Sequence, residues 1–299
     1  MAHYTLKLDD HSTGNAIFTD LDGTLLDEKQ RLSPVNRKTL HKLGEDGVCR
    51  VVITGRTLFS ACRVLDSEFP IDLLVTSSGA GIFNFPGKKL LHSTSMKISD
   101  VRRSAILLKE LALNFMIHAP LPDNHIFLWH KSLTGNLDFD NRLKIYEGYH
   151  KPLPKDLTTV GEATQLLIVC PKEDNGHLHP ILQTKLSDLT VIRTTSPLDH
   201  SSVWYEIFPQ GTSKAGAAAW ICNHHKLNRK TSLAIGNDYN DLDLLLWSNF
   251  SRIVENAPLS LRRQFTVVPD NKNNGFSKAV ADWRQSKLTC KITKANHQR

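Results

Sequence analysis

Residues 16 to 26 read Ala-Ile-Phe-Thr-Asp-Leu-Asp-Gly-Thr-Leu-Leu, and this stretch decides the fold that we expect. An apolar run ends here in two carboxylates, Asp20 and Asp22, which stand two positions apart. In an extended backbone this spacing points both side chains to the same side, and Gly23 supplies the freedom that a sharp turn needs. The pattern therefore predicts a buried strand whose end presents two acids to one ligand.

Paired carboxylates at the end of a strand can carry out phosphoryl transfer. One ionised Asp can attack phosphorus and form an aspartyl-phosphate, while a second donates a proton to the leaving oxygen and later activates water. The second Asp needs surroundings that raise its pKa above about 3.9, the value of a free side chain. Asp-x-Asp also occurs in metal-dependent glycosyltransferases, and an Asp pair in a loop is often only a turn or a helix cap. Other segments of the chain decide between these interpretations.

Residues 49 to 56, Cys-Arg-Val-Val-Ile-Thr-Gly-Arg, repeat the design of the first segment. A β-branched run ends in a hydroxyl residue and a glycine, and a helical pattern follows from Thr57. Thr54 can donate its hydroxyl to a phosphate oxygen, and Gly55 lets backbone N–H groups approach at the positive end of the following helix. An ordinary helix cap is the alternative role for Thr54.

Two later segments add a cation and a group of oxygen donors. Lys214 falls in the first turn of a predicted helix from about 215 to 225, where the helix dipole does not favour a positive charge. That placement predicts an anion close to Lys214, although most lysines are simply solvated. Further along, a short strand is predicted to end in Gly236, and a helix follows it. Between them stand oxygen donors of the kind that Mg²⁺ prefers, namely Asn237, Asp238, Asn240 and Asp241.

In this order the four segments resemble those of the haloacid dehalogenase superfamily, most closely its Cof-type sugar-phosphate phosphatases with a large inserted cap. The resemblance covers most of residues 14 to 85 and 205 to 285. It implies that Asp20 is the nucleophile and Asp22 the general acid/base, and that both contact Mg²⁺, Asp22 through its backbone carbonyl. It also implies that Thr54 binds the transferring phosphoryl group.

The resemblance gives Lys214 the task of neutralising the phosphoryl charge, so Thr54, Gly55 and Lys214 form the predicted phosphate-binding set. The predicted metal site contains Asp20, Asp22, Asn237, Asp238 and Asp241. The usual fourth motif of the family is Gly-Asp-x-x-Asn-Asp, and Asn237 replaces its first acid here. An amide oxygen can still ligate Mg²⁺ but adds no negative charge. Which of Asn237, Asp238 and Asp241 touches the metal directly stays open.

Length, composition and charge limit the class of protein. A chain of 299 residues that is 40% hydrophobic can bury a large core and is expected to form two units. No run of about 18 apolar residues and no signal peptide is visible, so we expect a cytoplasmic protein that does not bind a membrane. The five cysteines are scattered without a Cys-x-x-Cys pair, which argues against disulfides and structural zinc.

The net charge of +7 raises nucleic acid as a partner, but four of the positive charges lie in the last 13 residues, which contain no acid. The remaining mild excess suits a small phosphorylated substrate equally well. No nucleic-acid-binding motif is present. We therefore expect a small phosphorylated metabolite as the partner, and neither nucleic acid nor membrane. Neither the oligomeric state nor the exact substrate follows from the sequence.

Strands and helices alternate from residue 16 to residue 78, which calls for a parallel sheet with right-handed crossovers and a ligand at the carboxyl ends of its strands. We expect an α/β fold in which a doubly wound parallel sheet, a Rossmann-like haloacid dehalogenase core, carries an inserted α+β cap. The predicted units are the core in two parts, 1–86 and 209–286, the cap at 87–208, and a basic, disordered tail at 287–299.

The predicted insertion is too long for a loop and has its own pattern of elements. Strands are expected near 125–130, 164–170, 190–194 and 202–208, and helices near 99–113, 137–147 and 178–187. Such a cap closes over the site, excludes water and supplies substrate contacts. Arg142, Trp129 and His130 are candidates for these contacts, and the sequence does not rank them.

The leading hypothesis is a Mg²⁺-dependent phosphoric monoester hydrolase acting on a small phosphorylated metabolite, with a sugar phosphate as the favoured class. A phosphomutase shares the paired Asp residues but returns the phosphoryl group to a sugar. A non-catalytic protein that binds a phosphorylated metabolite is the third hypothesis, and it is motivated by Asn237 in place of an acid.

Overall fold

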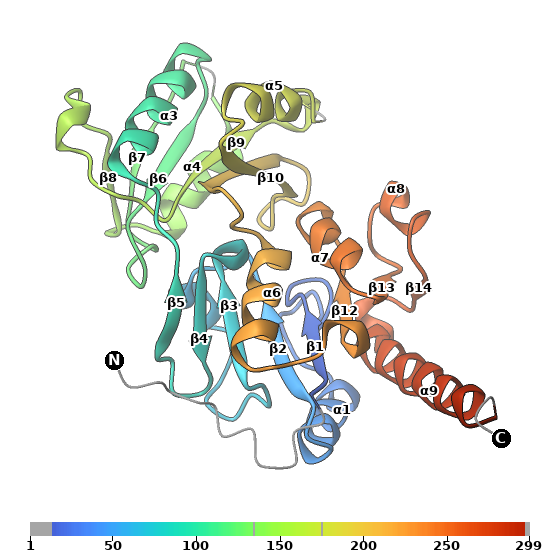
Figure 1. The fold of residues 1–299 in the computed structure, drawn as a ribbon. Coiled ribbons are helices and arrows are strands. Elements are labelled where there is room, and N and C mark those ends of the chain that lie inside the picture. The colour runs from blue at the N-terminus through green and yellow to red at the C-terminus, as the bar shows by residue number, and fades with distance from the viewer. Residues whose placement is uncertain (1–13, 134, 175, 297–299) are drawn as a thin grey trace.

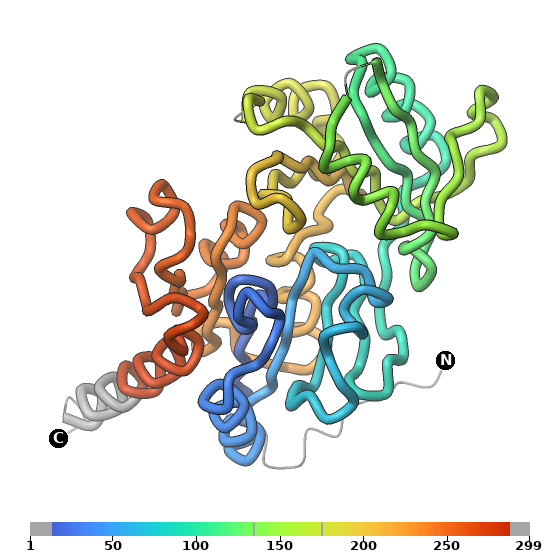
Figure 2. Tube along the Cα trace, turned by 180° about the vertical axis from the view of Figure 1, so that it is seen from behind, coloured from blue at the N-terminus to red at the C-terminus, as the bar shows by residue number. Residues whose placement is uncertain are grey.

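The computed structural model describes residues 14–133, 135–174 and 176–296, and it describes side chains up to residue 287. Within these residues the chain forms an eight-stranded and a six-stranded sheet. Figures 1 and 2 show the smaller sheet with its helices at one end of the larger one. No helix in the described ranges is long and apolar enough to span a membrane.

The large sheet has the strand order β14-β13-β12-β1-β2-β3-β4-β5, and all pairs from β14 to β3 are parallel. Strands β4 and β5 extend it as antiparallel neighbours. Its strands are β1 (Ala16–Thr19), β2 (Cys49–Ile53), β3 (Leu73–Thr76), β4 (Gly81–Asn84), β5 (Leu90–Ser93), β12 (Leu233–Gly236), β13 (Phe250–Val254) and β14 (Val267–Val268). The sheet is therefore mixed, with a parallel centre.

Helices cover both faces of the large sheet. One face packs on α1 (Pro34–Glu45), α2 (Leu58–Ala61) and α9 (Gly275–Asn296), and the other on α6 (Lys214–His224), α7 (Leu242–Trp247) and α8 (Leu259–Arg262). Successive side chains of β1 point to opposite faces, so Ile17 joins one buried cluster and Phe18 joins the other. This arrangement confirms the doubly wound α/β core. Ser33 caps α1 through Asn36 N, and Pro34 opens the helix, as the sequence predicts.

The small sheet has the order β10-β11-β9-β6-β7-β8, and its pairs are antiparallel except for β7 with β8. Its strands are β6 (Phe115–His118), β7 (Phe127–His130), β8 (His150–Pro152), β9 (Gln165–Cys170), β10 (Leu189–Thr195) and β11 (Val203–Pro209). Helices α3 (Ile98–Glu110) and α5 (Leu178–Lys185) pack on one face, and α4 (Leu137–Ile145) packs on the other. This sheet with helices on both faces confirms the α+β fold that the sequence predicts for the cap.

Several boundaries differ from the predicted ones. Strand β5 pairs with the large sheet, so the chain crosses to the small sheet only after Ser93, later than residue 87. Helix α2 ends at Ala61, and the chain continues in turns where a helix to residue 66 is predicted. As domain boundaries, 86/87 and 208/209 stay predictions.

Helix α9 continues to Asn296, into the tail at 287–299 that the sequence predicts to be disordered, and the disorder of that tail stays a prediction. No glycine or proline follows Gly275 in this stretch, so nothing in the backbone interrupts the helix. Residues 297–299 lie outside the described part of the chain, as do residues 1–13 at the other end.

Candidate active site

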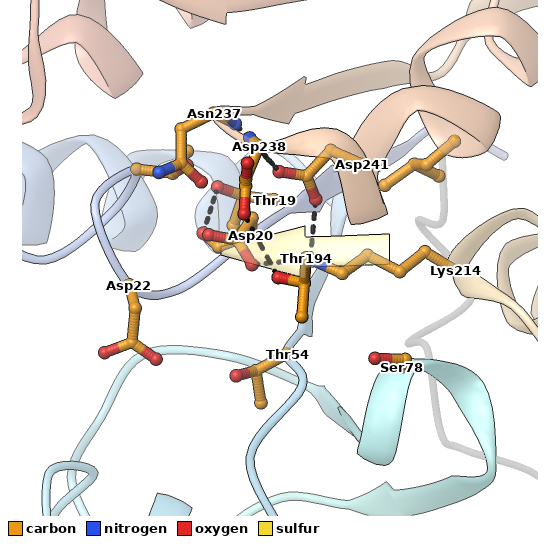
Figure 3. Close-up of polar contacts among 12 residues, drawn as sticks. Thr19, Asp20, Asp22, Thr54, Ser78, Thr194, Lys214, Asn237, Asp238 and Asp241 are labelled. Atoms are coloured by element: carbon orange, nitrogen blue, oxygen red, sulfur yellow. Dashed lines mark hydrogen bonds and ion pairs between the residues drawn. The ribbon is translucent and has the colours of Figure 1, made fainter. Parts of the chain in front are cut away.

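The functional side chains that the sequence predicts meet at the carboxyl ends of the parallel strands. Asp20 follows β1 and is held by a hydrogen bond of 2.9 Å from its backbone N–H to the Ile235 carbonyl oxygen in β12. Thr54 follows β2, and its N–H donates to the Val75 carbonyl oxygen at 2.9 Å. Figure 3 shows Asp20, Thr54 and Lys214 in one place. The sheet thus brings together residues that are up to 194 positions apart.

Lys214 is a fully buried charge of the site, and its side chain is 0% exposed. Its Nζ donates to Asp20 Oδ1 and to Asp241 Oδ1, each at 2.6 Å. The anion that the sequence predicts beside this lysine is therefore confirmed, and there are two. Burial acts to lower the pKa of Lys214, but the charges of Asp20 and Asp241 outweigh it and raise that pKa.

Asp20 combines burial with one free oxygen. Its Oδ1 accepts from Lys214, while its Oδ2 has no hydrogen-bond partner within the described residues. Burial raises the pKa of Asp20 to about 7, and the neighbouring Lys214 opposes this rise. A second cation beside Asp20 would favour the charged form further, because opposite charge stabilises a carboxylate.

Asp22 is oriented by a residue to which the sequence gives no separate role. Arg56 donates from Nε and Nη2 to the two carboxylate oxygens of Asp22, each at 2.7 Å, in a bidentate ion pair. Figure 3 shows the Asp22 carboxylate turned away from Asp20. The sequence carried a signal for Arg56, since it directly follows Thr54 and Gly55 at the end of a strand.

Thr54 does not act as a helix cap, which is the alternative role that the sequence allows for it. Thr57, not Thr54, caps α2 by accepting from Ser60 N. The Thr54 hydroxyl accepts from Arg56 N at 3.1 Å, and its proton remains available to a ligand. Beside it, Ser78 N donates to the Thr54 carbonyl oxygen at 3.0 Å. A Cβ on Gly55 would lie 3.5 Å from Ser78 Oγ, so the two turns are in contact.

Ser78 is a second residue of the site that the sequence shows only as part of a small-residue segment. It has a φ of 52°, and Gly79 after it has a φ of +118°. A Cβ on Gly79 would lie 2.3 Å from the Ser213 carbonyl oxygen, so only glycine fits between this turn and the start of α6. The Ser78 hydroxyl donates to Glu206 Oε2 at 2.6 Å, which joins the turn to β11 of the small sheet.

The fourth segment distributes its acids among different tasks. Asp241 accepts through Oδ2 from the N–H groups of Asn237 and Asp238, at 2.8 and 3.0 Å, so both of its oxygens are occupied. Asn237 Oδ1 accepts from Thr24 Oγ1 at 3.2 Å. A Cβ on Gly23 would lie 2.6 Å from Asn237 Nδ2, so glycine lets the loop after β1 approach this amide.

Asp238 faces the small sheet. Its Oδ2 accepts from Thr195 N at 2.8 Å and from Thr194 Oγ1 at 3.1 Å, and its Oδ1 accepts from Thr195 Oγ1 at 3.1 Å. Figure 3 shows Thr194 beside Asp238. Next to this contact, the Arg193 guanidinium lies 4.1 Å from the centre of the Tyr239 ring. The end of β10 therefore docks on the loop that carries the predicted metal residues.

The donor set of the site fits a hard cation such as Mg²⁺. Asp20 Oδ2, the Asn237 amide oxygen and backbone carbonyl oxygens are the oxygen ligands that Mg²⁺ prefers. No group of three or more His, Cys, Asp or Glu side chains is arranged for a metal in the part of the chain that the structure describes. A metal here would rely on one carboxylate supplemented by amide, carbonyl and water oxygens.

Comparisons with known proteins agree with this fold and site. The family model described as haloacid dehalogenase-like hydrolase matches residues 17–280, and the chain belongs to that family. The 5-amino-6-(5-phospho-D-ribitylamino)uracil phosphatase YcsE of Bacillus subtilis is 23% identical over 274 residues, which cover 89% of this chain and 94% of the relative. The predicted family and the predicted enzyme class, a phosphoric monoester hydrolase, are confirmed.

Solved structures show the same fold. The phosphatase BT1666 from Bacteroides thetaiotaomicron aligns with a TM-score of 0.73 at 20% identity and covers 94% of this chain and 99% of its own. The subclass IIB sugar phosphatase BT4131 aligns with a TM-score of 0.70 at 16% identity and covers 90% and 98%. Both alignments span the large and the small sheet.

We predict that Lys214→Met destabilises the protein by about 3–5 kcal/mol, because it leaves Asp20 and Asp241 buried without their cation. Urea unfolding measures the loss. Lys230→Met is the matched control, since Lys230 is exposed and its replacement is expected to cost less than about 0.5 kcal/mol. Adding Asp20→Asn to Lys214→Met should recover part of the stability. Equal stability of the two single variants would contradict the prediction.

Proposed function

We propose that the protein is a Mg²⁺-dependent phosphatase that hydrolyses a small phosphorylated metabolite, with a sugar phosphate as the favoured class, through an aspartyl-phosphate intermediate. The observation that carries the proposal is the Asp20 carboxylate at the end of β1, with Oδ1 held by Lys214 at 2.6 Å and Oδ2 without a partner in the described residues. A buried carboxylate with one oriented and one free oxygen is arranged to act as a nucleophile.

The proposed reaction has two halves, and Asp20 and Asp22 act in both. Asp20 attacks phosphorus, the bond from phosphorus to the leaving oxygen breaks, and Asp22 gives that oxygen a proton. In the second half, Asp22 takes a proton from water, the water oxygen attacks the phosphoryl group, and the Asp20 carboxylate is released with inorganic phosphate. In the structure Arg56 holds both oxygens of Asp22, so Asp22 has to leave this ion pair and turn toward Asp20 before it acts as the acid and the base. Thr54, Gly55 and Lys214 hold the phosphoryl oxygens and offset their charge.

Asp20, the backbone carbonyl of Asp22 and Asn237 are the residues that we assign to a bound Mg²⁺. When bound, the ion neutralises charge on the phosphoryl oxygens. We assign Asp241 to positioning and not to the metal, because its oxygens accept from Lys214 and from two backbone N–H groups. Asp238 is committed to β10, so we assign it to the contact between the sheets and not to the metal.

The relatives support the substrate class. YcsE is named a phosphatase of a phosphorylated ribitylamino compound, and BT4131 is named a sugar phosphatase. Both names describe a phosphate ester on a small polar molecule. We also propose a cytoplasmic location, which the scattered cysteines of the sequence support.

We predict that Asp20→Asn lowers kcat at least about 10³-fold, because an amide cannot form the aspartyl-phosphate. Release of inorganic phosphate from a panel of sugar phosphates and other phosphorylated metabolites, with Mg²⁺ or with excess chelator, measures activity. Asp66→Asn is the matched control, since Asp66 is exposed and lies outside the site, where it pairs with Arg37 at 3.5 Å and accepts from Glu68 N at 2.9 Å.

Three outcomes of this screen would contradict the proposal. Undiminished phosphate release by Asp20→Asn would show that Asp20 is not the nucleophile. Transfer of the phosphoryl group to another sugar without free phosphate would indicate a phosphomutase. Thermal stabilisation by several panel members without any turnover would indicate a binding protein.

We predict that Asp238→Ala loosens the end of β10 and leaves the metal site intact. The Thr195 amide, which donates to Asp238, should exchange its hydrogen at least about tenfold faster. Titration calorimetry should show Mg²⁺ affinity within about threefold of the unmodified protein, whereas Asn237→Ala should lower it at least about tenfold. Equal loss of Mg²⁺ affinity in both variants would place Asp238 among the metal ligands.

A further inference from the structure

Arg142 on α4 is a buried cation whose side chain has no hydrogen-bond partner among the described residues. Its guanidinium lies over two aromatic rings, with the guanidinium carbon 4.8 Å from the centre of the Trp204 ring and 5.1 Å from that of Tyr146. The residue is only 9% exposed. Within the described ranges nothing accepts a hydrogen bond from its Nε, which is itself buried. The N–H donors of a guanidinium lie in its plane along the edge, so a ligand can reach them beside the aromatic contacts.

The two acids near Arg142 are engaged with other partners. Glu206 and Asp138 act on the pKa of Arg142 in the direction opposite to burial, so both lie in its neighbourhood. However, the oxygens of Glu206 accept from Ser78 and Gln165, at 2.6 and 3.0 Å. Those of Asp138 accept from Ser196 Oγ and Trp204 Nε1, at 3.0 and 2.6 Å. Both acids favour the charged form of Arg142 by their negative charge. Neither accepts a hydrogen bond from its N–H groups.

Arg142 belongs to the side of the small sheet that faces the proposed active site. Glu206 and Trp204 stand two positions apart in β11, so their side chains lie on the same face of the small sheet, and Tyr205 lies on the other. Arg142 packs against Trp204 on that face. From that face Glu206 reaches Ser78, whose N–H is bonded to the carbonyl of Thr54. A second connection runs from Tyr146, whose ring lies 6.4 Å from that of Phe59 in α2.

Other buried polar atoms without partners share this region. His118 Nε2, Asn124 Oδ1 and Gln165 Oε1 have no hydrogen-bond partner in the part of the chain that the structure describes. The His118 Nδ1 atom lies 2.7 Å from the Asn124 carbonyl oxygen, and Asn124 Nδ2 donates to Ser77 Oγ at 2.6 Å. His118 and Gln165 are register partners in β6 and β9. Buried polar groups in native proteins are normally paired, so a cluster of orphaned ones indicates a polar ligand.

The structure also ranks the three substrate-contact candidates from the sequence. Trp129 Nε1 already donates to His150 Nδ1 at 3.0 Å. His130 packs its ring 5.2 Å from that of Phe115, and its pKa is lowered by burial and by Lys109. Only Arg142 combines a full charge, nine-tenths burial and free donors. A neutral hydroxyl would satisfy one donor, whereas an oxyanion accepts two parallel N–H bonds and balances the charge.

We infer that the guanidinium of Arg142 binds a second oxyanion, either a carboxylate or a second phosphate, on the part of the substrate that leaves as the alcohol. This inference rests on the proposed phosphatase function and narrows its substrate class. The preferred substrates are phosphate monoesters that carry another anionic group, and neutral sugar phosphates are poorer ones. Lys214 and Thr54 would hold the transferring phosphoryl group, and Arg142 would hold the other end of the molecule.

The test compares pairs of substrates that differ in the second anion, in the presence of Mg²⁺. Glycerol 3-phosphate against 3-phosphoglycerate and glucose 6-phosphate against 6-phosphogluconate report a carboxylate, and fructose 6-phosphate against fructose 1,6-bisphosphate reports a phosphate. We expect the unmodified protein to favour at least one anionic member by tenfold or more in kcat/KM. Arg142→Gln should lower kcat/KM for that member at least tenfold, mainly through KM, and change its neutral partner less than threefold.

Two further variants separate recognition from packing. Arg142→Lys keeps the charge and should recover part of the preference. Arg229→Gln is the matched control, because Arg229 also stacks on a tryptophan, at 5.0 Å from the Trp247 ring, but is exposed. Unchanged turnover of the neutral partner shows that Arg142→Gln is folded. Equal loss for both members of every pair, or no preference in the unmodified protein, would overturn the inference and leave the proposed phosphatase function standing.

A binding measurement makes the inference testable even without turnover. In Asp20→Asn with Mg²⁺, the preferred anionic member should raise the melting temperature more than its neutral partner, and adding Arg142→Gln should abolish the difference. If the unmodified protein releases no phosphate but this difference is present, the proposed function fails and the anion site stands. If the difference is absent, the anion site fails.

Discussion

The buried ammonium of Lys214 is the interaction on which the rest of the site depends. A charge that is fully removed from water is tolerated only when opposite charges stand against it, and here Asp20 and Asp241 do so at 2.6 Å each. Lys214 begins α6, Asp20 follows β1, and Asp241 follows β12. One cation therefore fixes the relative positions of three elements at the edge where the parallel strands end. The same cation orients one oxygen of Asp20 and leaves the other free.

The sequence predicts the core well because strong local signals and topology point to one arrangement. Apolar runs that end in Asp20, Thr54 and Gly236 are short buried strands, and parallel strands bring such ends to one edge. Lys214 is detectable because a cation in the first turn of a helix conflicts with the helix dipole. The sequence does not show that Arg56 holds Asp22, since that contact depends on side-chain directions after a turn. It shows Arg56 only as a neighbour of Thr54.

The small sheet is predicted less completely. Strand β6 (Phe115–His118) is absent from the predicted elements although it lies in the middle of the sheet, because four residues after an amphipathic helix carry no periodicity of their own. Asp238 is similar. Its place among oxygen donors predicts a metal role, but its carboxylate faces Thr194 and Thr195, which are far away in the sequence. Pairings between the two sheets depend on how the sheets dock, and local pattern does not encode that.

The contacts between the two units include both hydrogen bonds and an aromatic contact, in which Phe59 of α2 packs on the rings of His125 and Tyr146. Ser78 with Glu206, Ser77 with Asn124, and Asp238 with Thr195 join the two units by hydrogen bonds around the proposed phosphoryl site. Hydrogen bonds of this kind can be replaced by bonds to water when two units separate. In the arrangement that the structure shows, the cap covers the proposed phosphoryl site, and a cover of this kind would exclude water from the reacting centre.

This division of tasks explains where charge is placed in the molecule. The core sheet carries Asp20, Lys214 and Asp241, whose mutual contacts need no substrate. The cap carries Arg142, whose donors lack an acceptor within the described residues. Because Asp20, Lys214 and Asp241 pair with one another, their positions do not depend on a residue of the cap. An anion that arrives with the substrate would supply the acceptor that the Arg142 donors lack, and on our inference this gain would favour the arrangement in which the cap covers the site.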